Sequence, residues 1–302
     1  MSGAGSKYND DFSDVSKYAR EILKKADVGD RLPTPVDDIV ECAELVVSGE
    51  IDLSPRHFDF IASSKNLLLS VLAKVKGLVD LRENVILLDP TCTSGKKNFV
   101  KLHEVGHKAL PWQRQSLLYL DDDITLDPDT KDRFEREASF FASEVLFQGN
   151  RFDREARDLP LEINSAKYLA KRYGSSIHAA LRRFVRTNHR ACSLLVVERE
   201  KPEADGLPMR LHVRNTEQSE RFVTTVGSVG WPEYLADGFP ATPLIRAGRR
   251  WCEDEQIQFR YKNGSTKECR FQLFDNQHNA IFIFIVPVEE RATTRTRFII
   301  QR

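Results

Sequence analysis

The spacing of the hydrophobic residues changes near residue 191, and this change constrains the fold more than any other feature of the sequence. Before it, apolar residues recur with the period of amphipathic helices, as in residues 14–27, 36–46 and 132–148. After it, short runs rich in β-branched and aromatic residues alternate with turn residues. The β-type runs read "ACSLLVVERE", "MRLHVRN", "ERFVTTVG", "QIQFRYKNG", "ECRFQLFD" and "NAIFIFIVPVE". We therefore expect an α+β protein with a β-rich C-terminal domain over residues 191–302.

Length and charge exclude several classes of protein. The chain has 302 residues, enough for two domains, and its 45 Lys+Arg balance its 45 Asp+Glu. No net field draws it to nucleic acid or to a membrane surface, and no apolar run approaches the roughly 20 residues of a membrane span. Residues 1–13 lack the apolar segment of a signal peptide, and we expect them to be disordered. The five cysteines are scattered without a CxxC pair, which favours reduced thiols in a cytoplasm.

A short motif within "FVKLHEVGHKALPW" (residues 99–112) indicates chemistry. Residues i and i+4 of a helix share one face, so His103 and His107 can direct their imidazoles at one point. Neutral imidazole binds Zn²⁺ well, and two such ligands leave room for a third and for a water. Glu104 projects beside the pair, where it can take a proton from a metal-bound water. HExxH also occurs by chance, so a helix that merely contains two histidines is the competing interpretation.

A third ligand downstream would favour a metal site, and "FEREASFFASEVLF" supplies a candidate. Glu135 shares its helix face with the small residues Ala138, Ser139 and Ala142, which permit close packing against the HEVGH helix. A carboxylate on such a face needs a partner, and a metal ion is a good one. Glu137 is the rival ligand, although it lies on a different side of the same helix. The alternative for Glu135 is a position at the rim of an exposed face.

Together these two segments resemble the ImmA/IrrE family of zinc metallopeptidases. The family pattern is an HExxH helix followed by a helix that reads roughly E-x-E-A-N/D-x-F-A-x-x-L-L. The resemblance implies a mainly helical, zincin-like metallopeptidase domain with a small sheet. It also implies one Zn²⁺ per chain bound by His103, His107 and Glu135, with Glu104 as general base. Ser139 departs from the family's Asn or Asp, and the proline that usually follows the leucines is missing.

The family's usual layout resembles the division of this chain. We expect the peptidase domain over residues 14–155, a helix-turn-helix-like segment over 156–190 and a C-terminal domain that is sensor-like. The helical segment carries basic residues and no acid from Lys171 to Arg190. Its second helix presents Arg182, Arg183 and Arg186, which offer contacts to nucleic acid or to a protein partner. The alternative, which we favour, is a helical pair that packs on the peptidase domain and uses its arginines for solubility or for a protein partner.

The resemblance implies a cytoplasmic regulator that cleaves a helix-turn-helix transcriptional repressor and so derepresses stress-response or mobile-element genes. A DNA-binding regulator with a vestigial site, or a ligand sensor with structural zinc, is the alternative. The strand "NVILLD" is either a core strand or the edge along which an extended substrate adds. No membrane partner is expected.

Overall fold

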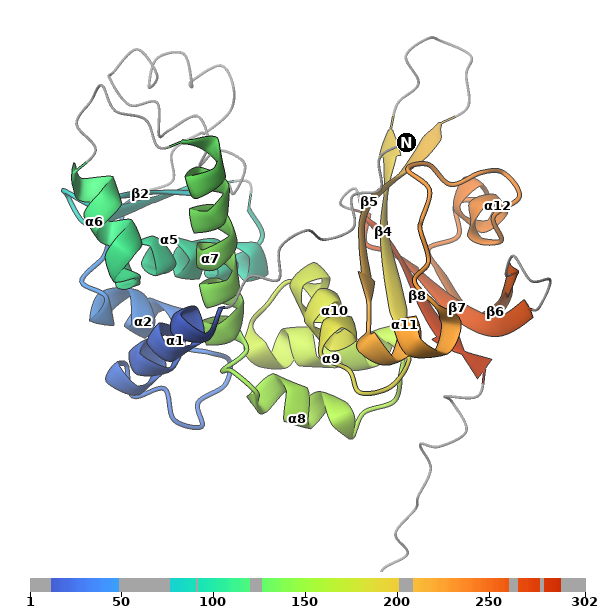
Figure 1. The fold of residues 1–302 in the computed structure, drawn as a ribbon, viewed down its shortest axis with the longest axis horizontal. Coiled ribbons are helices and arrows are strands. Elements are labelled where there is room, and N and C mark those ends of the chain that lie inside the picture. The colour runs from blue at the N-terminus through green and yellow to red at the C-terminus, as the bar shows by residue number, and fades with distance from the viewer. Residues whose placement is uncertain are drawn as a thin grey trace, which may run out of the picture. The chain divides into compact units, whose positions relative to one another are not determined.

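The computed structural model describes residues 12–48, 77–90, 92–119, 127–200, 209–260, 266–277 and 280–288. These residues form two compact units (Figure 1). The first unit comprises Met1–Phe152 and Ala170–Ser176, and the second comprises Asp153–Leu169 and Ile177–Arg302. The first unit is mainly helical with a small sheet, and the second is built on a larger sheet, so the fold is α+β as predicted.

Helices dominate the first unit. They are α1 (Ser13–Lys25), α2 (Val36–Cys42), α5 (Ser94–Ala109), α6 (Pro111–Tyr119) and α7 (Pro128–Leu146). Helix α7 begins earlier than the sequence indicates, because Asp127 accepts hydrogen bonds from the backbone amides of Asp129 and Thr130 and Pro128 occupies the first turn. Residues 120–126, which precede this helix, are outside the described residues.

The small sheet of the first unit has the order β1-β3-β2, with β1 (Val46–Val47), β2 (Gly77–Asp80) and β3 (Val85–Leu88). Strand β3 pairs in parallel with β1 and antiparallel with β2, so it is central among the described strands. An edge role for "NVILLD" is therefore wrong, because both of its sides already have a neighbour. Its apolar residues Ile86 and Leu88 face the core, as the core-strand alternative predicts.

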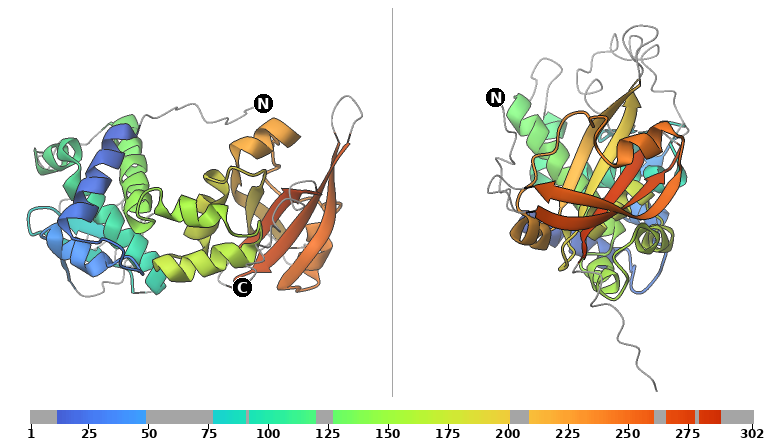
Figure 2. Two further views of the ribbon diagram at one scale, coloured as in Figure 1. Left: turned by 90° about the horizontal axis from the view of Figure 1, so that it is seen from below. Right: turned by 90° about the vertical axis from the view of Figure 1, so that its right-hand side faces the viewer.

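The second unit contains a five-stranded antiparallel sheet, which faces the viewer in the right-hand view of Figure 2. Its order is β5-β4-β8-β7-β6, with β4 (Ser193–Glu200), β5 (Arg210–Gln218), β6 (Trp251–Arg260), β7 (Thr266–Asp275) and β8 (Ile281–Pro287). The helices of this part of the chain are α8 (Arg151–Arg157), α9 (Ile163–Tyr173), α10 (Ile177–Arg186), α11 (Glu220–Val226) and α12 (Ala241–Arg246). The division between the units falls within α8 and within α9.

The central strand β8 is buried on both faces, which explains its continuous apolar run. Ile281, Ile283 and Ile285 belong to the cluster that includes Phe222 of α11 and Ala241 of α12. The alternate residues point to the other face, where the ring of Phe284 lies 6.1 Å from that of Phe184 in α10. Successive side chains of a strand point to opposite faces, so a strand covered on both sides must be apolar throughout.

One predicted strand is a helix. "ERFVTTVG" forms α11, because Ser219 caps it by accepting a hydrogen bond from the amide of Phe222. Phe222 and Val226 are spaced one turn apart and are both buried. The β-branched residues of this run favoured a strand locally, and the cap and the helical spacing of its apolar residues outweigh that preference.

Candidate metal centre

Helix α5 presents the HEVGH residues on its buried side. His103 and Glu104 are fully buried and His107 is 2 % exposed. The spacing of the two histidines places both imidazoles over the same part of the helix, with the Nε2 atoms 3.1 Å apart. The helix stops at Ala109, Leu110 adopts an extended conformation, and Pro111 starts α6. The two histidines therefore lie in the second half of α5, close to the point where the chain turns into α6.

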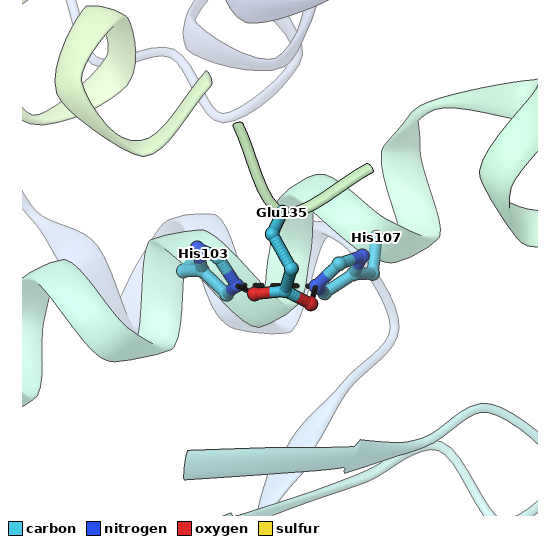
Figure 3. Close-up of side chains that lie close together, drawn as sticks. All are labelled: His103, His107 and Glu135. Carbon is cyan, nitrogen blue, oxygen red and sulfur yellow. Dashed lines mark hydrogen bonds and ion pairs between the residues drawn. The ribbon is translucent and has the colours of Figure 1, made fainter. Parts of the chain in front are cut away.

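Helix α7 brings Glu135 to the two histidines (Figure 3). The Oε2 atom of Glu135 lies 3.2 Å from Nε2 of His103, and its Oε1 atom lies 3.5 Å from Nε2 of His107. The two helices approach closely because Gly106 faces Ala138, and a Cβ on Gly106 would lie 3.2 Å from the Ala138 Cα atom. The small residues that favoured Glu135 as the third ligand thus do bring it to the HEVGH helix.

The donor atoms of these three residues fit a zinc ion. They all lie within 4.8 Å of one another and form a cluster of metal-binding type. Zinc bonds of about 2.0–2.1 Å at tetrahedral angles separate neighbouring ligand atoms by roughly 3.3 Å. The observed separations of 3.1, 3.2 and 3.5 Å surround that value. Two imidazoles and one carboxylate are also the donor set of catalytic zinc sites, which leave a fourth position open.

Each histidine has a partner on its other ring nitrogen. Nδ1 of His107 lies 2.8 Å from Oε1 of Gln113, and Nδ1 of His103 lies 3.3 Å from Oγ of Ser139. Such partners orient the ring of a metal-binding histidine. Ser139, which stands where the family pattern has Asn or Asp, therefore lies beside one of the two histidines. Gln113 is a functional candidate that the sequence did not reveal, because only the turn from α5 into α6 brings it beneath His107.

Glu137 is placed away from the cluster, although it was the rival third ligand. Its Oε2 atom accepts hydrogen bonds from Nε1 of Trp112 at 2.6 Å and from Nε2 of Gln113 at 2.7 Å. Its Oε1 atom lies 3.6 Å from Nε of Arg133. These contacts turn the Glu137 carboxylate toward α6, while Glu135 on the same helix faces the two histidines.

Glu104 is buried without a hydrogen-bond partner for either carboxylate oxygen in the described part of the chain. Its pKa is raised to about 7, because burial and repulsion from Glu135 outweigh the lowering effects of His103 and of the nearby backbone of Val79. Val79 belongs to β2, so this strand lies next to the carboxylate. An ionisable group that is buried, unpaired and beside a metal-type cluster is typical of a catalytic group.

The three cluster residues have shifted pKa values of different sign. Burial, and after it the neighbouring His103, lower the pKa of His107 to about 4. Burial also lowers the pKa of His103, but its hydrogen bond to Glu135 and attraction to Glu104 and Glu135 outweigh this, so its pKa is raised. Burial raises the pKa of Glu135, yet contact with the histidines holds it below the usual value. The cluster thus favours a neutral His107 and an ionised Glu135, the forms that bind a metal.

The three arginines of α10 lie in the second unit and are engaged there. Arg182 and Arg186 both pair with Glu217 of β5, at 2.6 and 2.8 Å. Arg183 pairs with Asp153 of α8 through two hydrogen bonds of 2.9 Å. These ion pairs tie α10 to β5 and α8, and they give the basic residues a structural role in the unit.

Comparison with known proteins agrees with this geometry. Residues 69–185 match the IrrE N-terminal-like domain, Peptidase M78. A solved structure of a Mycobacterium tuberculosis transcriptional regulator is similar in fold, with a TM-score of 0.54 and 12% sequence identity over 92% of this chain and 76% of that one. No curated protein sequence matches the chain. Among the described helices, none combines the length and apolar character needed to cross a membrane.

Proposed function

We propose that the chain is a zinc-dependent endopeptidase, because residues 69–185 match the IrrE N-terminal-like domain, Peptidase M78. The observation that carries this proposal is the buried cluster of His103, His107 and Glu135 with the unpartnered carboxylate of Glu104 beside it. A structural zinc site has four protein ligands, whereas a catalytic site keeps a position open. Three donors together with a buried carboxylate fit the catalytic type.

His103, His107 and Glu135 would hold the zinc ion. Bound zinc supplies a Lewis acid that polarises the scissile carbonyl and lowers the pKa of water. Glu104 takes the proton of the attacking water and then passes it to the leaving amine. A cation in the cluster favours the ionised form of Glu104, because opposite charges stabilise each other at close range. The base is therefore available in the metal-loaded protein.

We further propose that the substrate is a helix-turn-helix transcriptional repressor in the cytoplasm. Its cleavage would derepress stress-response or mobile-element genes. The family match supports this role, since the IrrE N-terminal-like domain is the part of the chain that contains the cluster. An extended substrate has β2 as its candidate pairing strand, because β2 forms an outer strand of the described sheet and its Val79 lies by Glu104.

The test compares the native chain with Glu104→Gln, which keeps the size of the side chain and removes the base. We expect one zinc ion per chain in both proteins by elemental analysis. We also expect the native chain to cleave the repressor encoded beside its gene and Glu104→Gln to leave it intact, with the product identified by mass spectrometry. Glu41→Gln, an exposed glutamate of α2 in the same unit, is the matched control and should cleave like the native chain. Equal cleavage by Glu104→Gln, or a native chain without zinc, would contradict the proposal.

No observation favours the DNA-binding alternative over the peptidase. Its best support is the basic character of α10, and Arg182, Arg183 and Arg186 each pair with a carboxylate of their own unit. A surface that binds the phosphate backbone needs cations directed outward. The ligand-sensor alternative requires a closed zinc site, and the described residues supply three ligands rather than four.

A further inference from the structure

The two histidines of the cluster are held by partners of different kinds. Ser139 beside His103 has a hydroxyl that can donate or accept a hydrogen bond, so it fits either ring form. Gln113 beside His107 has a carbonyl oxygen that only accepts and an amide nitrogen that only donates. Which of the two faces His107 therefore decides which ring nitrogen of His107 carries the hydrogen.

The surroundings of Gln113 fix the direction of its amide. Gln113 is fully buried, and its nitrogen Nε2 lies 3.1 Å from the carbonyl oxygen of Phe134 and 2.7 Å from Oε2 of Glu137. A carbonyl and a carboxylate only accept, so both of these atoms require the amide nitrogen. The amide oxygen must then face His107, where it lies 2.8 Å from Nδ1.

Glu137, which lies on the far side of Gln113 from His107, also fixes the direction of the Gln113 amide. Its side chain is only 12% exposed, and the same oxygen that accepts from Gln113 also accepts from Nε1 of Trp112 at 2.6 Å. An indole N–H is a donor only, so Trp112 holds that oxygen in its accepting role. From Trp112 through Glu137 and Gln113 to His107, each hydrogen bond therefore has only one possible direction.

From this chain of hydrogen bonds we infer that Gln113, held by Glu137, is a positioning residue for the metal. It keeps the hydrogen of His107 on Nδ1 and so leaves the Nε2 lone pair directed at His103 and Glu135. The inference rests on the proposed function only in that it takes the cluster to be the zinc site. Gln113 itself lies beside the imidazole and away from the three donor atoms, so it acts through His107.

The first measurement uses the native chain before zinc is added, because a zinc ion on Nε2 would by itself leave the hydrogen of His107 on Nδ1. Nitrogen-15 spectra of the histidine side chains report which ring nitrogen is protonated, and we expect His107 to carry its hydrogen on Nδ1. A hydrogen on Nε2 of His107 would overturn the inference. This readout does not depend on any variant folding.

The second measurement is zinc affinity, determined by competition with a chelator. Gln113→Leu keeps a similar volume but can neither accept from His107 nor donate to Glu137. Loss of such a partner typically weakens metal affinity about 10–100-fold, and we expect a decrease of that size. Gln115→Leu makes the same chemical change at an exposed position of the same helix and should bind zinc like the native chain. An affinity within about threefold of native for Gln113→Leu contradicts the inference.

The outcomes separate this inference from the proposed function. Zinc binding that depends on Gln113 in a chain without peptidase activity supports the inference and contradicts the function. If Gln113→Leu changes neither zinc binding nor cleavage, the result supports the function and contradicts the inference. A native chain that binds no zinc at the cluster contradicts both.

Discussion

Glu104 and Glu135 show how two carboxylates of one site acquire different properties from their surroundings. Glu135 contacts two imidazoles, and those contacts hold its pKa below the usual value despite burial. Glu104 is fully buried without a hydrogen bond in the described part of the chain, and its pKa rises to about 7. A metal ligand must stay ionised, whereas a base must exchange protons. Their environments thus fit the two roles proposed for them.

Gly106 is the residue on which the approach of Glu135 depends. Its missing side chain lets Ala138 and Phe141 come within 3.2 Å of the place a Cβ would occupy. Gly106→Val would overpack this contact, and we expect a loss of about 1–3 kcal/mol in the free energy of unfolding. Because Glu135 lies on the same helix as Ala138, zinc affinity should fall as well. Both are measured by chemical denaturation and chelator competition.

Ala109→Val is the control for this change. It adds a β-branched side chain to the last turn of the same helix, at a partly exposed position. We expect it to leave zinc affinity near the native value. If Gly106→Val binds zinc as tightly as Ala109→Val, the close approach of α5 and α7 is not what places Glu135.

The site residues differ in how far the sequence predicts them. The spacing of His103 and His107 alone places their rings together, because helical geometry is local. Glu135 required one further assumption, that a face of small residues packs against the histidine helix. Gln113 could not be predicted, since it reaches His107 only after the chain turns from α5 into α6. Predictability therefore falls as a contact depends on more of the tertiary structure.

At the scale of whole elements the same limit appears in α11 and β3. The β-branched residues of α11 favour a strand, although the cap at Ser219 and the helical spacing of Phe222 and Val226 stabilise a helix. Strand β3 was recognised as apolar, but its central position depends on β1 and β2, which pair with it from elsewhere in the chain. Element type and element neighbours are thus decided partly by contacts that local patterns do not contain.

The ion pairs between α10 and β5 give a pH-dependent stability to the second unit. Burial raises the pKa of Glu217, but hydrogen bonds and attraction from Arg186 and Arg182 outweigh this and hold the pKa below its ordinary value of 4.5. A group with a lowered folded pKa stabilises the fold above its unfolded pKa and loses this contribution as pH falls through the folded value. The stabilisation is therefore complete near neutral pH and decreases below about pH 4.5.

Glu217→Gln should remove this contribution. We expect the variant to lose about 1–3 kcal/mol of unfolding free energy at pH 7, because two arginines lose their charged acceptor. The difference from the native chain should shrink as the pH falls below about 4.5 and through the lowered folded pKa of Glu217, below which this carboxyl is protonated in both states. Glu233→Gln, at an exposed position of the same unit, is the control. A difference that stays constant down to acidic pH would show that the pairs with Glu217 do not contribute as ion pairs.

For the molecule as a whole, the two units are interleaved along the sequence. Ala170–Ser176 belong to the first unit, although the residues before and after them in the sequence belong to the second. Within the first unit, Nδ2 of Asn98 donates a hydrogen bond of 2.8 Å to the carbonyl of Gly174. Gly95 lies so close to Ser175 that a Cβ would come within 2.6 Å of the Ser175 backbone. The helix that carries the HEVGH residues therefore rests on a segment distant in sequence.

Tyr173 is the test of this arrangement. It is fully buried, and its ring lies 6.1 Å from that of Phe147 and 5.3 Å from that of Phe152, both in the first unit. Tyr173→Ala should cost about 3–5 kcal/mol in the unfolding free energy of that unit, because a large core side chain is removed. The temperature at which zinc is released should fall with it, since the metal ligands lie in the same unit.

Tyr168→Ala provides the comparison, because Tyr168 lies on the same helix and is 54% exposed. It removes the same side chain from a position that contributes little core packing, so zinc release should occur near the native temperature. Calorimetry and zinc release measured on the same samples separate the two units, because only unfolding of the first should free the metal. If both variants release zinc at the native temperature, the segment around Tyr173 is not needed to hold the metal centre. A lowered release temperature in Tyr173→Ala alone would mean that the peptidase core extends beyond residue 155, where the sequence pattern placed its end.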